Sequence, residues 1–345
     1  MASKATSIDI AYRAGVSQST VSRALRNSPL VNLETRQRIQ AIAKELNYKV
    51  DKNASNLRMQ NSHTLALLIC EDPTNDESMI NPFFLSMLGS ITRATARQGY
   101  DLLVSFQQLS TDWHADYEDS NKADGIILLG YGDYMDYAHK LDKLIEKNTH
   151  FVIWGAEHNN KAVLSIGCDN HQGGFVATEH LLGLGHKHIA FLGDSSSRSP
   201  EFRDRYLGHV DALQSTGIEA DTQLQHDAIN TEASGYQAAN VLLDSGVTFD
   251  AIFTASDLIA IGAIRALKKR GVLVPEQVAV VGYDDIPVAS FANPALTTIK
   301  QDTQFAGEIL VESVLKLIRG QEVSQRLIKT HLVVRSSCGA NVEDN

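Results

Sequence analysis

The first fifty residues carry apolar side chains at helical spacing, in three groups separated by short polar connections. The expected apolar stripes are Ile8, Ala11 and Tyr12, then Val21, Ala24 and Leu25, then Ile39, Ile42, Ala43 and Leu46. Spacings of three and four residues place each group on one face of a helix. Gly15 suits a left-handed helix end, and Ser17 is a good N-cap for the next helix. The pattern predicts three short helices, the first two forming a helix-turn-helix.

From residue 64 the pattern changes to short apolar runs that alternate with helical segments. The apolar runs cover residues 64–70, 101–106, 125–129, 151–154, 164–168, 188–192, 250–253 and 279–283. Helical spacing occurs near residues 82–98, 136–147, 171–184, 200–215, 231–244, 256–270 and 302–319, with a last strand expected near 327–334. Continuous apolar runs are typical of parallel strands buried on both faces. We therefore expect an all-α helix-turn-helix head followed by an α/β body of two doubly wound parallel-sheet subdomains.

The outward side of the second predicted helix is polar. Its side chains carry the hydrogen-bonding groups that a helix needs to read base edges in the major groove. The expected base-reading residues are Gln18, Ser19 and Arg23. The expected phosphate contacts, which would fix the register on DNA, are Thr6, Thr20, Ser22 and Asn27. The alternative is a small three-helix bundle that binds no nucleic acid.

Charge is distributed unevenly along the chain. The net charge is -10, but residues 1–60 contain ten Lys and Arg against four Asp and Glu, a net charge of +6. The rest of the chain therefore carries -16. A basic head on an acidic body is expected to attract DNA phosphates through the head alone. A chance fluctuation in surface charge is the alternative, and its coincidence with the helix-turn-helix argues against it.

Cysteine usage and hydropathy favour a cytoplasmic protein. Cys70, Cys168 and Cys338 are odd in number and far apart, without a spacing that would indicate zinc or a disulfide framework. The first residues lack the apolar run of a signal peptide, and no stretch approaches the ~20 apolar residues of a membrane span. We expect no metal, no cofactor and no membrane partner.

Several short motifs of the head are shared with a known family. They are Asp9-Ile10-Ala11, Ala14-Gly15-Val16-Ser17, Thr20-Val21-Ser22-Arg23 and Leu46-Asn47-Tyr48. With them, residues 7–48 closely resemble the DNA-binding head of the lactose/galactose repressor (LacI/GalR) family of bacterial transcription regulators. Together these motifs form a long pattern, which is more specific than a short one. The resemblance implies that the head binds operator DNA.

The body resembles the same family's sugar-binding core, which is related to periplasmic binding proteins. The matching segments are Asn81-Pro82-Phe83-Phe84, Asp169-Asn170, Gly185-His186, Arg205-x-x-Gly208, Ser256-Asp257, Val281-Gly282-Tyr283-Asp284-Asp285 and Pro294-x-Leu296-Thr297-Thr298-Ile299. The match is weakest at residues 108–124, which are polar, acidic and short for the helix expected there.

The resemblance also implies a domain organisation. The expected parts are residues 1–49, a helix-turn-helix DNA-binding head; residues 50–62, a hinge; and residues 63–345, an effector-binding and dimerisation core. Within the core, one subdomain is expected to contain roughly residues 63–162 and 293–322. The other is expected to contain residues 163–292 and 323–340.

The hinge segment can be interpreted in two ways. Residues 49–62 are polar and lack an apolar face of their own, so their composition predicts a flexible linker. In the resembled family this segment becomes a helix on operator DNA, and a leucine wedges between bases in the minor groove. Ala54 and Leu57 match that family's Ala-x-x-Leu spacing. Val50-Asp51 departs from the usual Pro-Asn, and a carboxylate near phosphates weakens the expected hinge contribution.

An effector is expected in a cleft of the body, because ligands of open α/β sheets lie beyond the carboxyl ends of the strands. The candidate contacts are Phe83, Trp154, Arg205, Asn230, Asp257 and Asp284. Phe83 and Trp154 could stack on a ring of the ligand or pack in the core. Arg205 and Asp284 match the family's effector-binding arginine and hydroxyl-binding aspartate, whereas Asp257 could simply cap a helix.

These candidate side chains suit a neutral, hydroxyl-rich molecule. A phosphorylated sugar would need a basic nest, for which Arg198 and Arg203 lie near Arg205 in sequence. A purine or nucleoside is a further alternative, because the resembled family also contains such sensors. Ser195–Ser197 lacks the Gly-x-Ser-x-Gly pattern, and no dinucleotide or Walker loop is present, so an enzyme is not expected.

Together these patterns predict a cytoplasmic, DNA-binding transcriptional regulator, most simply a repressor. One head offers a single short recognition helix, so we expect a homodimer that reads both halves of a palindromic operator. A small sugar is expected to change the operator affinity allosterically. A periplasmic solute-binding protein and a sugar-processing enzyme are the weaker interpretations.

Overall fold

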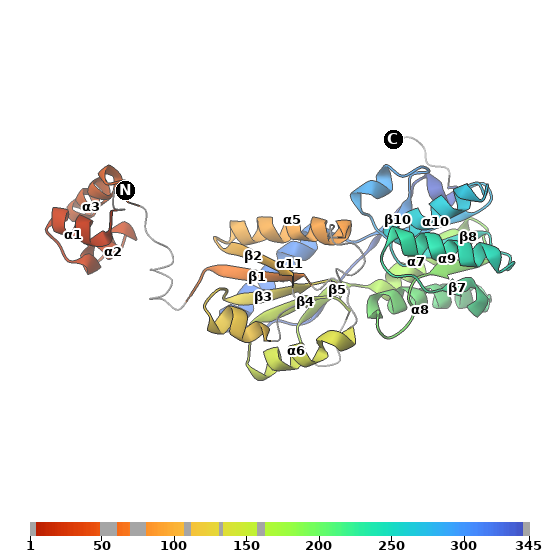
Figure 1. Ribbon diagram of the computed structural model, residues 1–345, viewed down its shortest axis with the longest axis horizontal. Coiled ribbons are helices and arrows are strands. Elements are labelled where there is room, and N and C mark those ends of the chain that lie inside the picture. Colours follow the sequence, from red (N-terminus) through yellow and green to blue (C-terminus); the bar gives the residue numbers. More distant parts are fainter. Residues whose placement is uncertain are drawn as a thin grey trace. The chain divides into compact units, whose positions relative to one another are not determined.

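The computed structural model describes residues 5–48, 61–69, 81–106, 112–130, 134–156 and 163–340, with the backbone alone for residues 134–138. The chain divides into two compact units, Met1–Ser62 and His63–Asn345 (Figure 1). Each unit encloses apolar residues of its own.

The head consists of three helices around a small apolar core. The helices are α1 (Ser7–Ala14), α2 (Gln18–Leu25) and α3 (Leu33–Glu45). Gly15 ends α1 with a left-handed backbone, at a φ of 64°. The side chains of Ser17 and Asn32 accept amide hydrogen bonds as the N-caps of α2 and α3. The predicted helix-turn-helix is confirmed.

The apolar stripe predicted for α1 is wrong in its register. Ile8 and Tyr12 are 63% and 90% exposed, whereas Ile10 is fully buried together with Ala11 and Ala14. Both sets of positions have helical spacing, so the pattern alone does not distinguish them. The small side chains of Ala11 and Ala14 let the neighbouring helices close around Ile10, and this packing decides which face is buried.

The first lobe of the body is built on a sheet of strand order β11-β5-β4-β3-β1-β2, in which neighbouring strands pair in parallel. The strands are β1 (Thr64–Ile69), β2 (Asp101–Phe106), β3 (Gly125–Leu129), β4 (Phe151–Trp154), β5 (Ser165–Cys168) and β11 (Arg326–Ile328). The helices are α5 (Pro82–Arg97), α6 (Tyr134–Glu146) and α11 (Thr303–Ile318) (Figure 1).

Both faces of this first sheet are buried. Leu65 and Leu67 of β1 pack in the core that includes α5 and α11, whereas Ala66 and Leu68 pack in the core that includes α6. This two-sided burial explains why the strands are continuous apolar runs. Among residues 112–124, which the structure describes, a short π-helix spans Ala115–Asp119 where the resemblance predicted a helix.

The second lobe has the strand order β12-β10-β9-β8-β6-β7. The strands are β6 (Ile189–Leu192), β7 (Gln225–His226), β8 (Ala251–Thr254), β9 (Ala279–Asp284), β10 (Thr297–Lys300) and β12 (His331–Val333). The helices are α7 (Asn170–Gly183), α8 (Pro200–Ser215), α9 (Glu232–Asp244) and α10 (Asp257–Lys269), and they pack as the pairs α7–α8 and α9–α10. Strand β12 pairs with β10 in the antiparallel direction, and the short strand β7 was not predicted.

The chain passes between the lobes at points that differ from the predicted boundaries. Strands β5 and β11 belong to the first sheet and β10 belongs to the second. The crossings therefore follow residues 168, 300 and 328, and the expected boundaries at 162, 292 and 322 are corrected. The single strand expected near 327–334 is divided between the two sheets as β11 and β12. A local apolar run does not reveal which sheet accepts it, because that depends on the pairing partner.

Candidate functional site

The start of α2 carries a group of exposed, hydrogen-bonded side chains. The Ser17 hydroxyl accepts a hydrogen bond from the Thr20 amide and lies 2.8 Å from the hydroxyls of Ser19 and Thr20. Gln18 Nε2 donates to Ser7 Oγ at 2.8 Å, which ties α2 to the first turn of α1. Exposed bonds of this kind can be exchanged for bonds to DNA at little cost.

In the remaining part of α2, the Arg23 side chain is exposed to solvent and the Ser22 hydroxyl is hydrogen-bonded to Arg26. Arg26 Nη2 donates to Ser22 Oγ at 2.9 Å. Asn27 follows α2 with a left-handed backbone, at a φ of 55°, and its carboxamide oxygen accepts from Gln40 Nε2 at 2.8 Å. Helix α3 therefore fixes the end of α2, and the exposed Arg23 side chain extends from a rigid support.

Thr6 has a structural role at the start of α1. Its amide and hydroxyl both donate to Asp9 Oδ2, at 2.8 and 2.7 Å, and its hydroxyl accepts the Asp9 amide. This reciprocal capping box fixes the first turn of α1. Ala54 and Leu57 lie outside the described residues. The DNA contacts expected from all these residues stay predictions.

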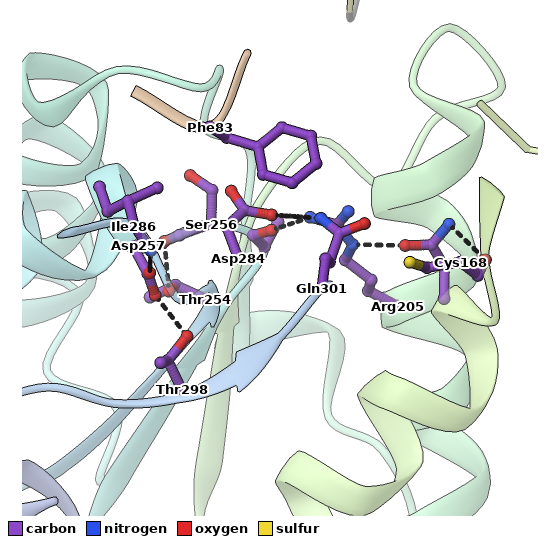
Figure 2. Close-up of polar contacts among 12 residues, drawn as sticks. Phe83, Cys168, Arg205, Thr254, Ser256, Asp257, Asp284, Ile286, Thr298 and Gln301 are labelled. Carbon is purple, nitrogen blue, oxygen red and sulfur yellow. Dashed lines mark hydrogen bonds and ion pairs between the residues drawn. The ribbon is translucent and has the colours of Figure 1, made fainter. Parts of the chain in front are cut away.

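In the body, Arg205, Asp284 and Gln301 converge on one buried point (Figure 2). Arg205 Nη1 lies 3.7 Å from Asp284 Oδ1, and Gln301 Nε2 donates to the same oxygen at 2.6 Å. Arg205 belongs to α8, Asp284 ends β9, and Gln301 follows β10. The three side chains therefore meet at the carboxyl end of the second sheet, where open parallel sheets bind their ligands.

Arg205 is held in a single orientation. It is fully buried, its Nε donates to Asn170 Oδ1 at 2.9 Å, and its Nη1 donates to the Ala255 carbonyl. The guanidinium carbon lies 3.7 Å from the centroid of the Tyr283 ring. A Cβ on Gly174 of α7 would lie 2.0 Å from the Arg205 carbonyl oxygen, so glycine is needed for the close packing of α7 on α8. The guanidinium is thus held in place with little freedom to reorganise.

Asp284 is buried with only 3% of its surface exposed and has a positive φ of 117°. Burial raises its pKa to about 7, although Arg205 and the Gln301 hydrogen bond favour the charged form. Its protonation state is therefore divided at neutral pH. A ligand hydroxyl that donates to Asp284 would favour the carboxylate.

Asp257, which the sequence predicted as a ligand contact, makes hydrogen bonds within the protein beside the site. Its Oδ1 accepts the Thr298 hydroxyl at 2.6 Å and its Oδ2 accepts the Ile286 amide at 2.8 Å. Ser256 is the N-cap of α10. Burial and then the nearby Asp284 raise the pKa of Asp257 well above its ordinary value. Both oxygens are thus used to connect strands beside the site.

Phe83 and Trp154 are buried together in the first lobe. They are 1% and 3% exposed, and their ring centroids are 6.2 Å apart. The Asn81 side chain accepts the Phe83 amide at 2.9 Å, which fixes Phe83 in the first turn of α5. Figure 2 shows Phe83 projecting from this lobe toward the side of the polar cluster. Trp154 supports Phe83 from within the core.

Asn230 lies in the segment between β7 and α9. Among the described residues, both polar atoms of its side chain are buried without a hydrogen-bond partner. Burying an unsatisfied amide is costly, so this side chain favours a polar ligand that can pair with it.

The sequence interpretation missed two polar residues of the cluster and one contact between the lobes. Gln301 and Asn170 directly orient Asp284 and Arg205. Asn170 belongs to the matching segment Asp169-Asn170, and Gln301 closely follows the matching segment that ends at Ile299, so position in or near a matching motif was the available signal. Glu201, only 6% exposed, accepts the Ala156 amide at 3.1 Å and thereby joins the second lobe to the first.

Comparisons with known proteins identify the family. The model described as "Bacterial regulatory proteins, lacI family" matches residues 8–51, and that described as "Periplasmic binding protein-like domain" matches residues 178–338. The HTH-type transcriptional regulator AscG of Escherichia coli strain K12 is 31% identical over 339 residues, covering 96% of this chain and 98% of that protein. The chain belongs to the lacI family of bacterial regulatory proteins.

Solved structures of similar regulators match nearly the whole length of this chain. The transcriptional regulator CelR–cellobiose complex has a TM-score of 0.72 at 30% identity, covering 96% of this chain and 99% of that one. The lac repressor dimer bound to operator and the anti-inducer ONPF has a TM-score of 0.83 at 27% identity, covering 98% and 100%. This lacI-family protein is therefore a DNA-binding transcriptional regulator with an effector-binding body. No helix among its described residues has the length and apolar composition needed to cross a membrane.

Proposed function

We propose that this regulator is a repressor whose operator affinity is controlled by a small neutral sugar bound at Arg205, Asp284 and Gln301. The main support is the fully buried guanidinium of Arg205, which lies 3.7 Å from a carboxylate oxygen of Asp284. A guanidinium can donate to neighbouring sugar hydroxyls while a carboxylate accepts from another. The aromatic ring of Phe83 supplies an apolar face for the sugar ring.

The charges around the site favour a neutral sugar over a phosphorylated one. Arg205 is already matched by Asp284. Arg198 and Arg203, the other candidates for a basic nest, have exposed side chains. A phosphate would therefore meet one neutralised arginine close to a second carboxyl group, that of Asp257. The structure of the relative CelR, whose title describes a cellobiose complex, adds support by analogy.

We further propose that the protein acts as a homodimer on a palindromic operator in the cytoplasm and has no enzymatic activity. The lac repressor similar to it is described as a dimer bound to operator. The face that we assign to the partner copy carries exposed apolar side chains of β2 and α5: Leu103, Val104, Phe106 and Leu85, which are 38%, 41%, 53% and 55% exposed. The Asp101 amide of β2 donates to the His63 carbonyl, so this face borders the point where the head segment enters the body.

Control by the effector requires that the sugar bind one closure state of the lobes better than another. A sugar held by Arg205 and Asp284 from the second lobe and by Phe83 from the first would favour closure. The Glu201–Ala156 hydrogen bond is a further contact between the lobes. Coupling of ~1–3 kcal/mol would change the DNA affinity ~5–150-fold.

The test is fluorescence anisotropy of the full chain on palindromic DNA from upstream of its own gene, with neutral sugars, sugar phosphates and purines as effectors. We expect one neutral sugar to change the DNA affinity at least ~5-fold. Gln301→Ala should weaken this response and leave sugar-free DNA binding unchanged. A response to purines alone or sugar phosphates alone would contradict the proposed effector class.

A further inference from the structure

A cavity of about 390 Å³ lies in the second lobe, away from the effector site. It is enclosed by the start of β6, by α8 and by the segment that leads from α8 to β7. Its lining includes the exposed residues Lys187 and His188, which precede β6, whereas Asp284 and Gln301 lie at the carboxyl ends of parallel strands. The cavity and the effector site are therefore at opposite ends of the same sheet. Its volume falls within the ~300–1,000 Å³ range of small-molecule sites.

The floor of the cavity is aromatic. The rings of Phe191, Tyr206 and His209 form a cluster, in which the Phe191 centroid lies 5.2 Å from that of Tyr206 and 5.9 Å from that of His209. His209 Nδ1 is 2.9 Å from the Thr178 hydroxyl, and burial lowers the pKa of His209 to about 3. The imidazole is therefore neutral at physiological pH, and an uncharged aromatic cluster supports the half-buried Tyr206 ring that lines the cavity. Flat aromatic compounds bind such surfaces by offset or edge-to-face stacking.

The rim of the cavity is polar and slightly acidic. The hydrogen-bonding residues around it are Lys187, His188, Glu219, Asp221, Gln225 and Thr248. Two carboxylates against one ammonium group disfavour a ligand that carries phosphate. Hydroxyl, carboxamide and carboxylate groups can instead pair with ring nitrogens and amino groups at the edge of a heterocycle.

We propose that this cavity is a second small-molecule site, which binds a flat, uncharged heteroaromatic compound of the nucleobase type. Its ring packs against Tyr206, which is half-buried and rests on Phe191, and its polar edge faces the rim. Helix α8 links the two sites, because Arg205 of α8 belongs to the effector cluster and Tyr206, His209 and Leu213 of α8 line the cavity. A ligand in the cavity therefore contacts the helix that orients Arg205.

The test adds adenine to the full-length protein. Calorimetry measures the binding, and hydrogen–deuterium exchange locates it. We expect saturable binding of one adenine per chain and slower exchange in α8 and residues 216–226. Adenosine monophosphate should bind at least ~10-fold more weakly, because its phosphate meets the acidic rim. Slower exchange confined to the segments around Asp284 and Gln301 would locate adenine in the effector site and overturn the proposal.

A pair of tryptophan variants tests directly whether adenine binds in the cavity. Ala220→Trp places a large side chain at a half-buried lining position and should reduce adenine affinity at least ~10-fold by filling the cavity. Gln214→Trp, at an exposed position of α8 outside the lining, is the matched control and should bind as the wild type does. Equal adenine binding by both variants, or no saturable binding by the wild type, would refute the site.

Discussion

At the scale of single residues, two arginines have opposite surroundings and therefore different uses. Arg23 is exposed on α2, where its guanidinium can move to meet a base. Arg205 is buried and is held by Asn170, Ala255 and Asp284. The first can adapt to DNA at an entropic cost, whereas the second presents a fixed geometry to a small ligand.

We expect Arg23→Ala to remove discrimination at one base pair of each half-site. A bidentate contact to guanine contributes ~1–3 kcal/mol of discrimination, whereas non-specific binding depends on phosphate contacts. Competition binding with single-base operator variants measures the effect. Arg38→Ala on the exposed side of α3 is the control and should keep the base preference. Preserved discrimination in the Arg23 variant would show that another residue reads that base pair.

Asp284 should make stability depend on pH in a defined direction. Its pKa is raised from 3.8 to about 7 in the folded state, so folding favours the protonated form. The contribution of Asp284 to the free energy of unfolding is fully present below the unfolded pKa and is lost as the pH rises toward 7, by ~2–4 kcal/mol at most. Urea unfolding of wild type and Asp284→Asn from pH 4 to 8 measures the difference. A difference that does not change over this range would contradict the assigned environment.

At the scale of elements, the pair α7–α8 is organised by glycines that permit close contact. A Cβ on Gly174 would meet the Arg205 carbonyl oxygen, and one on Gly208 would meet the His171 carbonyl oxygen, both at 2.0 Å. Backbone atoms cannot move aside as a flexible side chain can. The position of Arg205 therefore depends on a helix–helix distance and not only on its own hydrogen bonds.

We expect Gly174→Ala to separate α7 from α8, to destabilise the body by ~1–3 kcal/mol and to weaken effector binding. Gly183→Ala at the end of α7 is the matched control, because a Cβ there meets no atom within 4 Å. It should be neutral or stabilising by up to ~1 kcal/mol. Chemical denaturation and effector titration measure both variants. Equal stability of the two would contradict the close-packing argument.

At the scale of the whole molecule, control requires that effector binding, lobe closure and DNA binding be coupled to one another. The body contains both lobes and three passages of the chain between them, after β5, β10 and β11 in the part that the structure describes. In the proposed control, these passages and the Glu201–Ala156 bond would transmit lobe movement to β1, which follows the predicted hinge in sequence. A dimer would convert that movement into a change in half-site spacing.

We expect Phe106→Asp to weaken the proposed dimer by introducing a charge into its apolar face. Sedimentation at micromolar concentration should show more monomer, and affinity for the palindrome should fall at least ~10-fold while single half-site binding persists. Val241→Asp is the control, because Val241 is 56% exposed on α9, far in sequence from that face. An unchanged mass of the Phe106 variant would place the dimer interface elsewhere.

By itself, the sequence determined the features that depend on neighbours along the chain. The helix-turn-helix follows from Gly15, Ser17 and the helical spacing, and the two-lobed α/β body follows from apolar runs between helices. Arg205 and Asp284 were each predicted through resemblance as effector contacts, and the structure brings them within 3.7 Å of each other.

Only the tertiary structure decided the features that depend on partners distant in sequence. It set the buried face of α1, because two helical stripes were equally periodic and packing selected Ile10. It also assigned β5, β10 and β11 to their sheets. In addition, it determined that the two carboxylate oxygens of Asp257 accept hydrogen bonds from the Thr298 hydroxyl and the Ile286 amide. Strand pairing and burial arise from contacts across the fold, which the order of residues along the chain does not encode locally.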